Sequence, residues 1–251
     1  MSSDTLVGGW GAWRQLLRAA NVFTAVSNVL AGFLIASGTW PREIEGLAFL
    51  AAASALIYTA GMVLNDAFDA GIDSIERPNR PIPSRRISRR AAFAVGWMLL
   101  GGGVLVAFVI SGLAANAAPA VVACCLALTV VIYDAGLKYT WAGPWAMGWC
   151  RTLNVLLGAS GAAHFPRLPT VWAYAVAIGL YTVTLTYIAR REATGDSRAD
   201  AKRRAIVKRL ILGFIILDAI AATIATGWPS GLAILALLVP TLLLSRRTPM
   251  T

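Results

Sequence analysis

The sequence predicts an all-α protein: a polytopic bundle of about eight transmembrane helices that forms one domain over residues 1–251. The chain is 58% hydrophobic and only 14% of its residues are charged, and its mean hydropathy is +0.68. A water-soluble domain of this size needs far more polar surface. The apolar run from Ala91 to Tyr133 is long enough for two spans of roughly 20 residues each, with a short polar turn between them.

Apolar runs between charged, proline or glycine breaks define the expected spans in order. They lie near residues 18–38, 46–67, 91–111, 115–134, 143–163, 170–190, 206–226 and 230–245. The first 13 residues lack the basic region and cleavage site of a secretory signal. The first span is therefore expected to remain in the mature chain.

Basic residues gather on one side of these spans. That side would hold Arg14, Arg18, the six arginines from Arg77 to Arg90, Lys138, the cluster from Arg190 to Arg209, Arg246 and Arg247. The other side would hold only Arg42 and Arg167. The positive-inside rule then predicts an integral protein of the cell (inner) membrane with a cytoplasmic N-terminus. Anionic lipid headgroups account for the net charge of +10, so membrane lipids are expected partners and nucleic acid is not.

Two long polar loops, residues 68–90 and 191–205, lie on the predicted cytoplasmic side and carry most of the internal acidic residues. Asn65, Asp69 and Asp73 follow one another at intervals of four, so a continuous helix places them on one face, with Asp66 beside them. Neighbouring carboxylates repel one another unless a cation lies between them. Oxygen ligands of this kind suit Mg²⁺, which also keeps waters and phosphate oxygens.

Arginines follow the first acidic cluster in a segment that three prolines exclude from regular helix. They are Arg77, Arg80, Arg85 and Arg86. Arginine is suited to forked recognition of phosphate oxygens, so acids and arginines together indicate a site for a lipid diphosphate. The alternative is a polar loop whose charges pair with one another in water.

A second acidic cluster, Glu192, Asp196 and Asp200, repeats the spacing of four. These residues share a helix face only if the helix continues past Gly195. Two acidic clusters at one membrane face could hold a pair of Mg²⁺ ions bridged by diphosphate. Ionisation of a carbon–oxygen bond is the chemistry that such a pair favours.

Several segments resemble the UbiA-type intramembrane prenyltransferase superfamily. The segment NDAFDAGIDSIERPNRPIPSRRIS from Asn65 to Ser88 is similar to its first signature, and YDAGLK from Tyr133 to Lys138 is similar to its tyrosine-to-lysine segment. RAANVFTAVSNVLAG in the first span and GPWAMGWCRTLNVLLG in the fifth resemble its helix patterns. The resemblance implies a helical bundle around a central cavity. It also implies Mg²⁺-dependent transfer of a prenyl group from its diphosphate to an aromatic or other small acceptor.

The resemblance also assigns roles to residues. Asn65, Asp69 and Asp73 would bind the first Mg²⁺–diphosphate with Asp66 in support, Glu192, Asp196 and Asp200 would form the second acidic motif, and Arg77, Arg80 and Lys138 would hold phosphate oxygens. The chain departs from the family pattern in three respects. Arg85 stands where the family usually has glycine, Glu192 opens a motif that is usually richer in aspartate, and eight spans are expected here instead of nine.

Polar and aromatic residues inside the predicted spans are candidates for a substrate pocket. They are Asn21, Tyr58, Tyr133, Arg151, Asn154 and Tyr187. Aromatic faces could stabilise an allylic cation. A direct ion pair between Arg151 and Asp218 is an alternative, purely structural role for that arginine.

Two other functions remain open. A terpene cyclase of the UbiA type would use the same ionising site without an acceptor. A cation-coupled transporter would use acids inside the membrane, although here the acids cluster at one membrane face and not at mid-depth.

Overall fold

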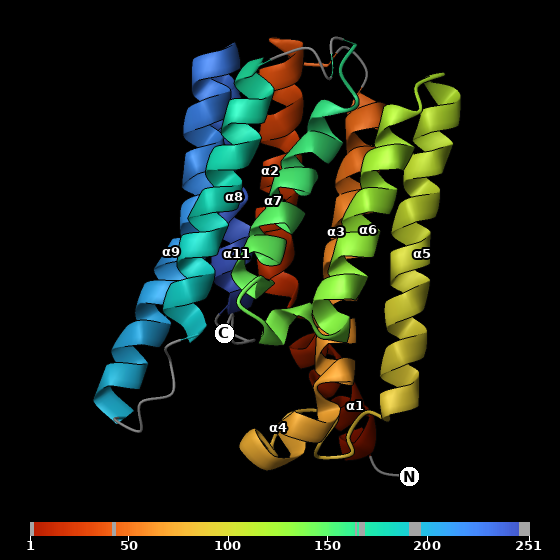
Figure 1. The fold of residues 1–251 in the computed structure, drawn as a ribbon, viewed down its shortest axis with the longest axis vertical. Coiled ribbons are helices and arrows are strands. Elements are labelled where there is room, and N and C mark those ends of the chain that lie inside the picture. Colours follow the sequence, from red (N-terminus) through yellow and green to blue (C-terminus); the bar gives the residue numbers. More distant parts are fainter. Residues whose placement is uncertain (1–2, 42–43, 164, 166–168, 191–196, 246–251) are drawn as a thin grey trace.

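The computed structural model describes residues 3–41, 44–163, 165, 169–190 and 197–245; for residues 3–8 and 197–204 it describes the backbone alone. Every regular element in this part of the chain is helical. The elements are α1 (Ser3–Leu17), α2 (Ala19–Ser37), α3 (Ile44–Phe68), α4 (Ala70–Glu76), α5 (Arg89–Leu113), α6 (Ala118–Ala135), the 3-10 turn η1 (Leu137–Tyr139), α7 (Gly143–Ala159), α8 (Pro169–Arg190), α9 (Ser197–Thr226), α10 (Trp228–Leu235) and α11 (Leu238–Ser245). The long helices run side by side in one bundle (Figure 1), which confirms the predicted fold class.

In the described part of the chain, six helical segments are long and apolar enough to cross a membrane. They are Gly9–Ser37, Ile44–Phe68, Arg89–Leu113, Ala118–Ala135, Pro169–Arg190 and Trp228–Ser245. The two other expected spans, 143–163 and 206–226, correspond to α7, which has 17 residues, and to α9, whose side chains are described only in part. Both helices lie within the bundle alongside α8 (Figure 1).

The centre of the bundle depends on small residues where α2 crosses α7. A Cβ added at Gly32 would collide with the carbonyl oxygen of Val155, and one added at Gly158 would collide with that of Val29. Small residues at helix crossings let backbones approach closely, which favours association inside a membrane. Gly32 and Gly158 therefore bring α7, which carries Arg151 and Asn154, against α2.

Helix α5 presents an apolar face to the outside of the bundle. Its exposed side chains include Trp97, Met98, Leu105, Phe108 and Leu113. Such a face has no packing partner within the described protein, and lipid chains are its natural environment. This face is a further mark of an integral membrane protein.

Two short helices close one end of the bundle, where α1 and α4 lie together with the turn between α6 and α7 (Figure 1). The chain breaks between α1 and α2 at Arg18, whose φ of 45° is left-handed. It bends again at Asp69, although the helical hydrogen bonds continue from Asp69 N to Asn65 O (3.0 Å) and from Asp73 N to Asp69 O (2.8 Å). The predicted loop 68–90 thus begins with a helical turn that keeps Asn65, Asp69 and Asp73 in register.

Candidate active site

The acids of the first cluster are held by basic side chains from distant parts of the sequence. Asp66 accepts hydrogen bonds from Arg18 (2.9 Å) and from Arg80 (3.3 Å). Arg80 also donates to Asp73 at 2.7 Å. Asp66 and Asp73 are both buried, so Arg80 joins the end of α3 to α4 through a shared guanidinium.

Asp69 has a different set of partners. The Lys138 ammonium lies 2.6 Å from its Oδ1, Asn65 donates to its Oδ2 at 3.2 Å, and the Tyr139 hydroxyl donates to Oδ1. Lys138 also donates to Asn65 Oδ1 at 3.0 Å. Partial burial of the phenol, with its hydrogen bond to Asp69, raises the pKa of Tyr139 above its ordinary value. Tyr139 therefore stays protonated and remains a donor to Asp69.

These residues form the mouth of an open chamber. Its rim is lined by Arg18, Asn65, Asp69, Arg77 and Arg80, and deeper parts of α6, α7, α8 and α9 complete it. Four of these five side chains carry a charge, and three of the four charges are positive. The described part of the chamber therefore favours an anion.

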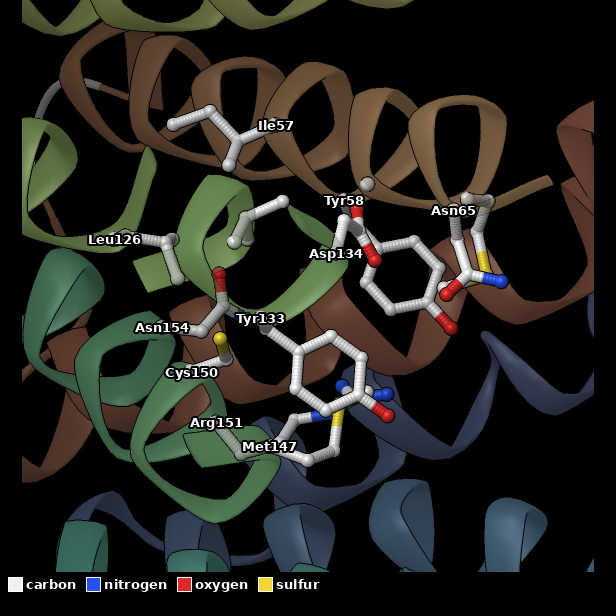
Figure 2. A pocket seen from close by; sticks show the side chains of 13 residues that line it. Ile57, Tyr58, Asn65, Leu126, Tyr133, Asp134, Met147, Cys150, Arg151 and Asn154 are labelled. Atoms are coloured by element: carbon white, nitrogen blue, oxygen red, sulfur yellow. The ribbon is translucent and has the colours of Figure 1, made fainter. Parts of the chain in front are cut away.

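A second, largely apolar pocket adjoins the chamber. It lies between α3, α6 and α7 (Figure 2). The two cavities share Tyr58, Met62, Asn65, Tyr133, Met147 and Arg151. The inner end of the pocket is lined by Ile57, Leu126 and Asn154. A charged chamber and an apolar pocket therefore adjoin each other across these shared side chains.

The residues present at the mouth suit a Mg²⁺ ion that is shared with a phosphate group. Asn65 and Asp69 line the chamber and carry the amide and carboxylate oxygens that suit Mg²⁺, which needs few protein carboxylates when substrate phosphates complete its shell. Within the described residues, no three His, Cys, Asp or Glu side chains form a metal-binding group. Asp66 and Asp73 face arginines instead.

The second acidic cluster lies outside this description. Glu192 and Asp196 are not among the described residues, and neither is the side chain of Asp200. The predicted pair of metal ions therefore remains a prediction.

The candidates for the substrate pocket differ in their positions. Tyr58, Tyr133 and Arg151 line both cavities, Asn21 lines the chamber, and Asn154 lines the inner pocket. Tyr187 is 43% exposed on α8 and is not among the residues that line either cavity. Tyr187 faces away because the helix turns its neighbours Leu185, Thr186 and Ala189 toward the chamber instead.

Arg151 is fixed by a buried polar network. It donates to the carbonyl of Thr24 (3.1 Å) and to Asn28 Oδ1 (2.9 Å), and its guanidinium lies 4.5 Å from the Phe214 ring centroid. Asn28 donates in turn to Asp218. The direct ion pair considered for Arg151 and Asp218 is thus replaced by a contact through Asn28.

Three residues that lie at or near the two cavities were not predicted from the sequence to belong to the site. Arg18 and Tyr139 bind acids of the first motif, and Asp134 lines the inner pocket. Asp134 lies within the YDAGLK segment and Tyr139 directly follows it, so the resemblance of this segment could have pointed to both residues. Arg18 is 48 residues from its partner Asp66, and no local spacing pattern links the two.

Fold and site together define a helical membrane protein with a chamber mouth rich in arginine beside an apolar pocket. The chain belongs to the UbiA prenyltransferase family, whose model matches residues 25–248. The family assignment agrees with the resemblance seen in the first acidic motif.

Curated relatives share one name. A digeranylgeranylglyceryl phosphate synthase of Methanoregula boonei is 39% identical over 125 residues, which are 50% of this chain and 42% of that protein. The synthase of the same name from Saccharolobus solfataricus is 31% identical over 171 residues, which are 65% of this chain and 58% of that protein. This chain thus spans about half the length of the curated relatives that it matches.

Solved structures share the fold. A UbiA homologue from Archaeoglobus fulgidus bound to DMAPP and Mg²⁺ superimposes with a TM-score of 0.61 and 16% identity, covering 92% of this chain and 85% of that one. A structure described as that of digeranylgeranylglyceryl phosphate synthase in membranes gives a TM-score of 0.60 and 19% identity, covering 96% and 97% of the two chains. At these identities the similarity concerns the fold alone.

Proposed function

We propose that this protein is a Mg²⁺-dependent intramembrane prenyltransferase that moves a prenyl group from its diphosphate to a small acceptor. The observation that carries this proposal is that a charged chamber and an apolar pocket share one set of lining residues. A prenyl diphosphate has an anionic head and an apolar tail. The chamber mouth matches the head, the inner pocket matches the tail, and Asn65, Tyr58 and Tyr133 lie where they meet.

The diphosphate would be held by Arg77, Arg80 and Lys138. Arg77 and Arg80 line the chamber, and Lys138 lies beside Asn65 and Asp69 at its rim. Asn65 and Asp69 would hold Mg²⁺, with Asp73, Glu192, Asp196 and Asp200 as further candidate ligands. A bound Mg²⁺ neutralises charge on the departing diphosphate. The basic side chains contribute to the same stabilisation because they face the place where negative charge develops.

The inner pocket would receive the prenyl group and keep water away from it. Its lining is mostly apolar, and Tyr58 and Tyr133 add aromatic faces at its entrance. Aromatic rings attract cations, so both tyrosines would stabilise an allylic cation. A water-poor space also favours capture of that cation by the acceptor over hydrolysis.

The acceptor class is suggested by the relatives. Their name describes glyceryl phosphate that carries two geranylgeranyl groups, so we propose an alcohol oxygen of a glyceryl phosphate lipid as the acceptor atom. The sequence led us to expect an aromatic or other small acceptor, so an aromatic acceptor remains a second prediction. The distribution of basic residues supports a cytoplasmic position for the chamber mouth in the cell membrane.

The proposal is tested with purified protein in lipid nanodiscs and prenyl diphosphates of increasing chain length. Diphosphate release and prenylated product should both require Mg²⁺, and Asp69→Ala should abolish both. Glu45→Ala is the matched control, because Glu45 lies in the first turn of the same helix, at its opposite end, and should retain activity. Release that is unchanged in Asp69→Ala would contradict the proposal. A terpene formed without any acceptor would indicate a cyclase instead.

A further inference from the structure

Asp134 is a buried carboxylate that the proposed diphosphate site does not use. It is the penultimate residue of α6, its exposed fraction is 3%, and it lines the inner pocket (Figure 2). Its Oδ2 has no hydrogen-bond partner among the described residues. A buried polar atom without a partner is destabilising, and such atoms are uncommon enough in folded proteins to need a reason.

The basic groups around Asp134 are already engaged. Lys138, one helical turn further along the chain, is bound to Asn65 and Asp69. Arg151 donates to Thr24 and Asn28. Within the described residues Asp134 takes part in no ion pair, whereas Asp66, Asp69 and Asp73 each have at least one. Asp134 thus differs from the acids of the first motif, since it is buried without an ion pair in the lining of the inner pocket.

We infer that Asp134 is the residue that binds the nucleophilic hydroxyl of the acceptor and takes its proton during transfer. This inference rests on the proposed prenyl transfer. A carboxylate that is to take a proton must start ionised, and an ionised carboxylate only accepts hydrogen bonds. The group that completes Oδ2 in that state is therefore a donor. An alcohol is the donor that the proposed reaction brings into the pocket.

The step balances without a further reactant. The acceptor oxygen forms a bond to C1 of the prenyl group, and the bond from C1 to the diphosphate oxygen breaks. The electron pair of the broken bond leaves with the diphosphate. The hydroxyl proton passes to Oδ2 of Asp134. Asp134 lines the inner pocket and follows Tyr133, which lines both cavities, so its carboxylate would lie close to where the two reactants meet.

Two substitutions separate binding of the hydroxyl from removal of its proton. Asp134→Asn keeps an oxygen that accepts a hydrogen bond but is not a base, and Asp134→Leu removes both properties at similar volume. The probes are geranylgeranylglyceryl phosphate with its free hydroxyl and the analogue that lacks this hydroxyl. Binding of each is measured by titration in nanodiscs without donor, so this readout does not depend on turnover.

The wild-type protein should bind the hydroxyl probe about 10-fold or more tightly than its deoxy analogue, because a hydrogen bond to a charged group is lost. Asp134→Leu should bind the two equally. Asp134→Asn should keep a preference for the hydroxyl but lower the rate of transfer by about 10²- to 10⁴-fold, the usual contribution of a general base. Donor affinity should be unchanged in both variants, and Glu45→Gln should behave like wild type.

The outcomes distinguish this inference from the proposed function. Equal binding of the two probes to wild type, no binding of either, or wild-type transfer rates in Asp134→Asn would each overturn the role of Asp134. Diphosphate release that depends on Mg²⁺ and Asp69 would still stand in all three cases. Conversely, a hydroxyl preference that Asp134→Leu removes would support the binding role of Asp134 even if no prenyl product formed. Thermal unfolding of Asp134→Asn, the isosteric variant, verifies that the fold is intact.

Discussion

Arg151 and Asp218 are buried on α7 and α9 and are joined through the side chain of Asn28. Asn28 accepts from Arg151 at 2.9 Å and donates to Asp218 at 3.0 Å and 2.8 Å. The hydroxyl groups of Ser27 and Tyr174 also donate hydrogen bonds to Asp218. One amide on α2 therefore lets two opposite charges lie inside the bundle without touching.

This network predicts a large effect of removing one charge. Asp218→Leu leaves the buried donors of Ser27, Asn28 and Tyr174 without their acceptor. It also leaves the Arg151 charge without a nearby opposite charge, so the free energy of unfolding should fall by about 3 kcal/mol. The double variant Arg151→Met/Asp218→Leu should lose less free energy of unfolding than the two single variants lose together, since no unpaired charge remains. Reversible unfolding in mixed detergent micelles measures each value. Strict additivity would show that the two charges are not coupled.

Arg80 links Asp66 to Asp73 and also lines the chamber. Arg80→Gln should lower kcat/KM for the prenyl diphosphate by about 10- to 100-fold, because charge-assisted hydrogen bonds are lost. Initial rates of diphosphate release measure the effect. Arg90, which is exposed on the first turn of α5, supplies the control Arg90→Gln. An equal loss in both variants would point to general surface charge and not to a specific site.

Arg85 has a φ of 62°, a left-handed conformation that glycine adopts without steric penalty. Arg85→Gly should therefore raise the free energy of unfolding by about 1 kcal/mol. Arg85→Ala removes the same charge but keeps Cβ, and it should give little of this gain. Thermal unfolding in detergent compares the two variants. A gain of equal size in Arg85→Ala would assign the effect to charge.

Metal removal should affect activity and stability differently. Asp66, Asp69 and Asp73 already have cationic partners in Arg18, Arg80 and Lys138, so the fold does not need a metal to offset their repulsion. EDTA should abolish diphosphate release, and added Mg²⁺ should restore it. The unfolding temperature should stay unchanged in parallel samples. A sharp fall in that temperature with EDTA would mean that the acids are not neutralised by these partners alone.

Much of the fold follows from the sequence because hydropathy is a local property. Apolar runs such as Ala91–Ile110 predict α5 almost residue for residue, and the spacing of Asn65, Asp69 and Asp73 predicts their shared register. The two short helices α1 and α4 were not predicted. Both depend on contacts at the end of the bundle, where Leu16 and Val63 are buried in one apolar cluster.

The site was less accessible to sequence reasoning, because its geometry depends on pairings over long separations. The charge of Arg18 was assigned to membrane topology, yet its guanidinium binds Asp66. Oδ2 of Asp134 has no hydrogen-bond partner in the described part of the chain, and Lys138, one helical turn further on, binds Asn65 and Asp69 instead. Tyr187 could not be separated from its neighbours, since a rotation of one residue on α8 decides which side chain faces the chamber.

The residues that line the inner pocket also set its depth. Asn65 at its entrance and Ile57 at its far end are eight residues apart on α3, which corresponds to about 12 Å along the helix axis. An extended isoprenoid longer than this must fold back or pass between helices into the bilayer. Ile57 and Leu126 would then limit the chain length of the prenyl donor. Smaller residues at these two positions would admit longer donors, and larger residues would restrict the enzyme to shorter donors.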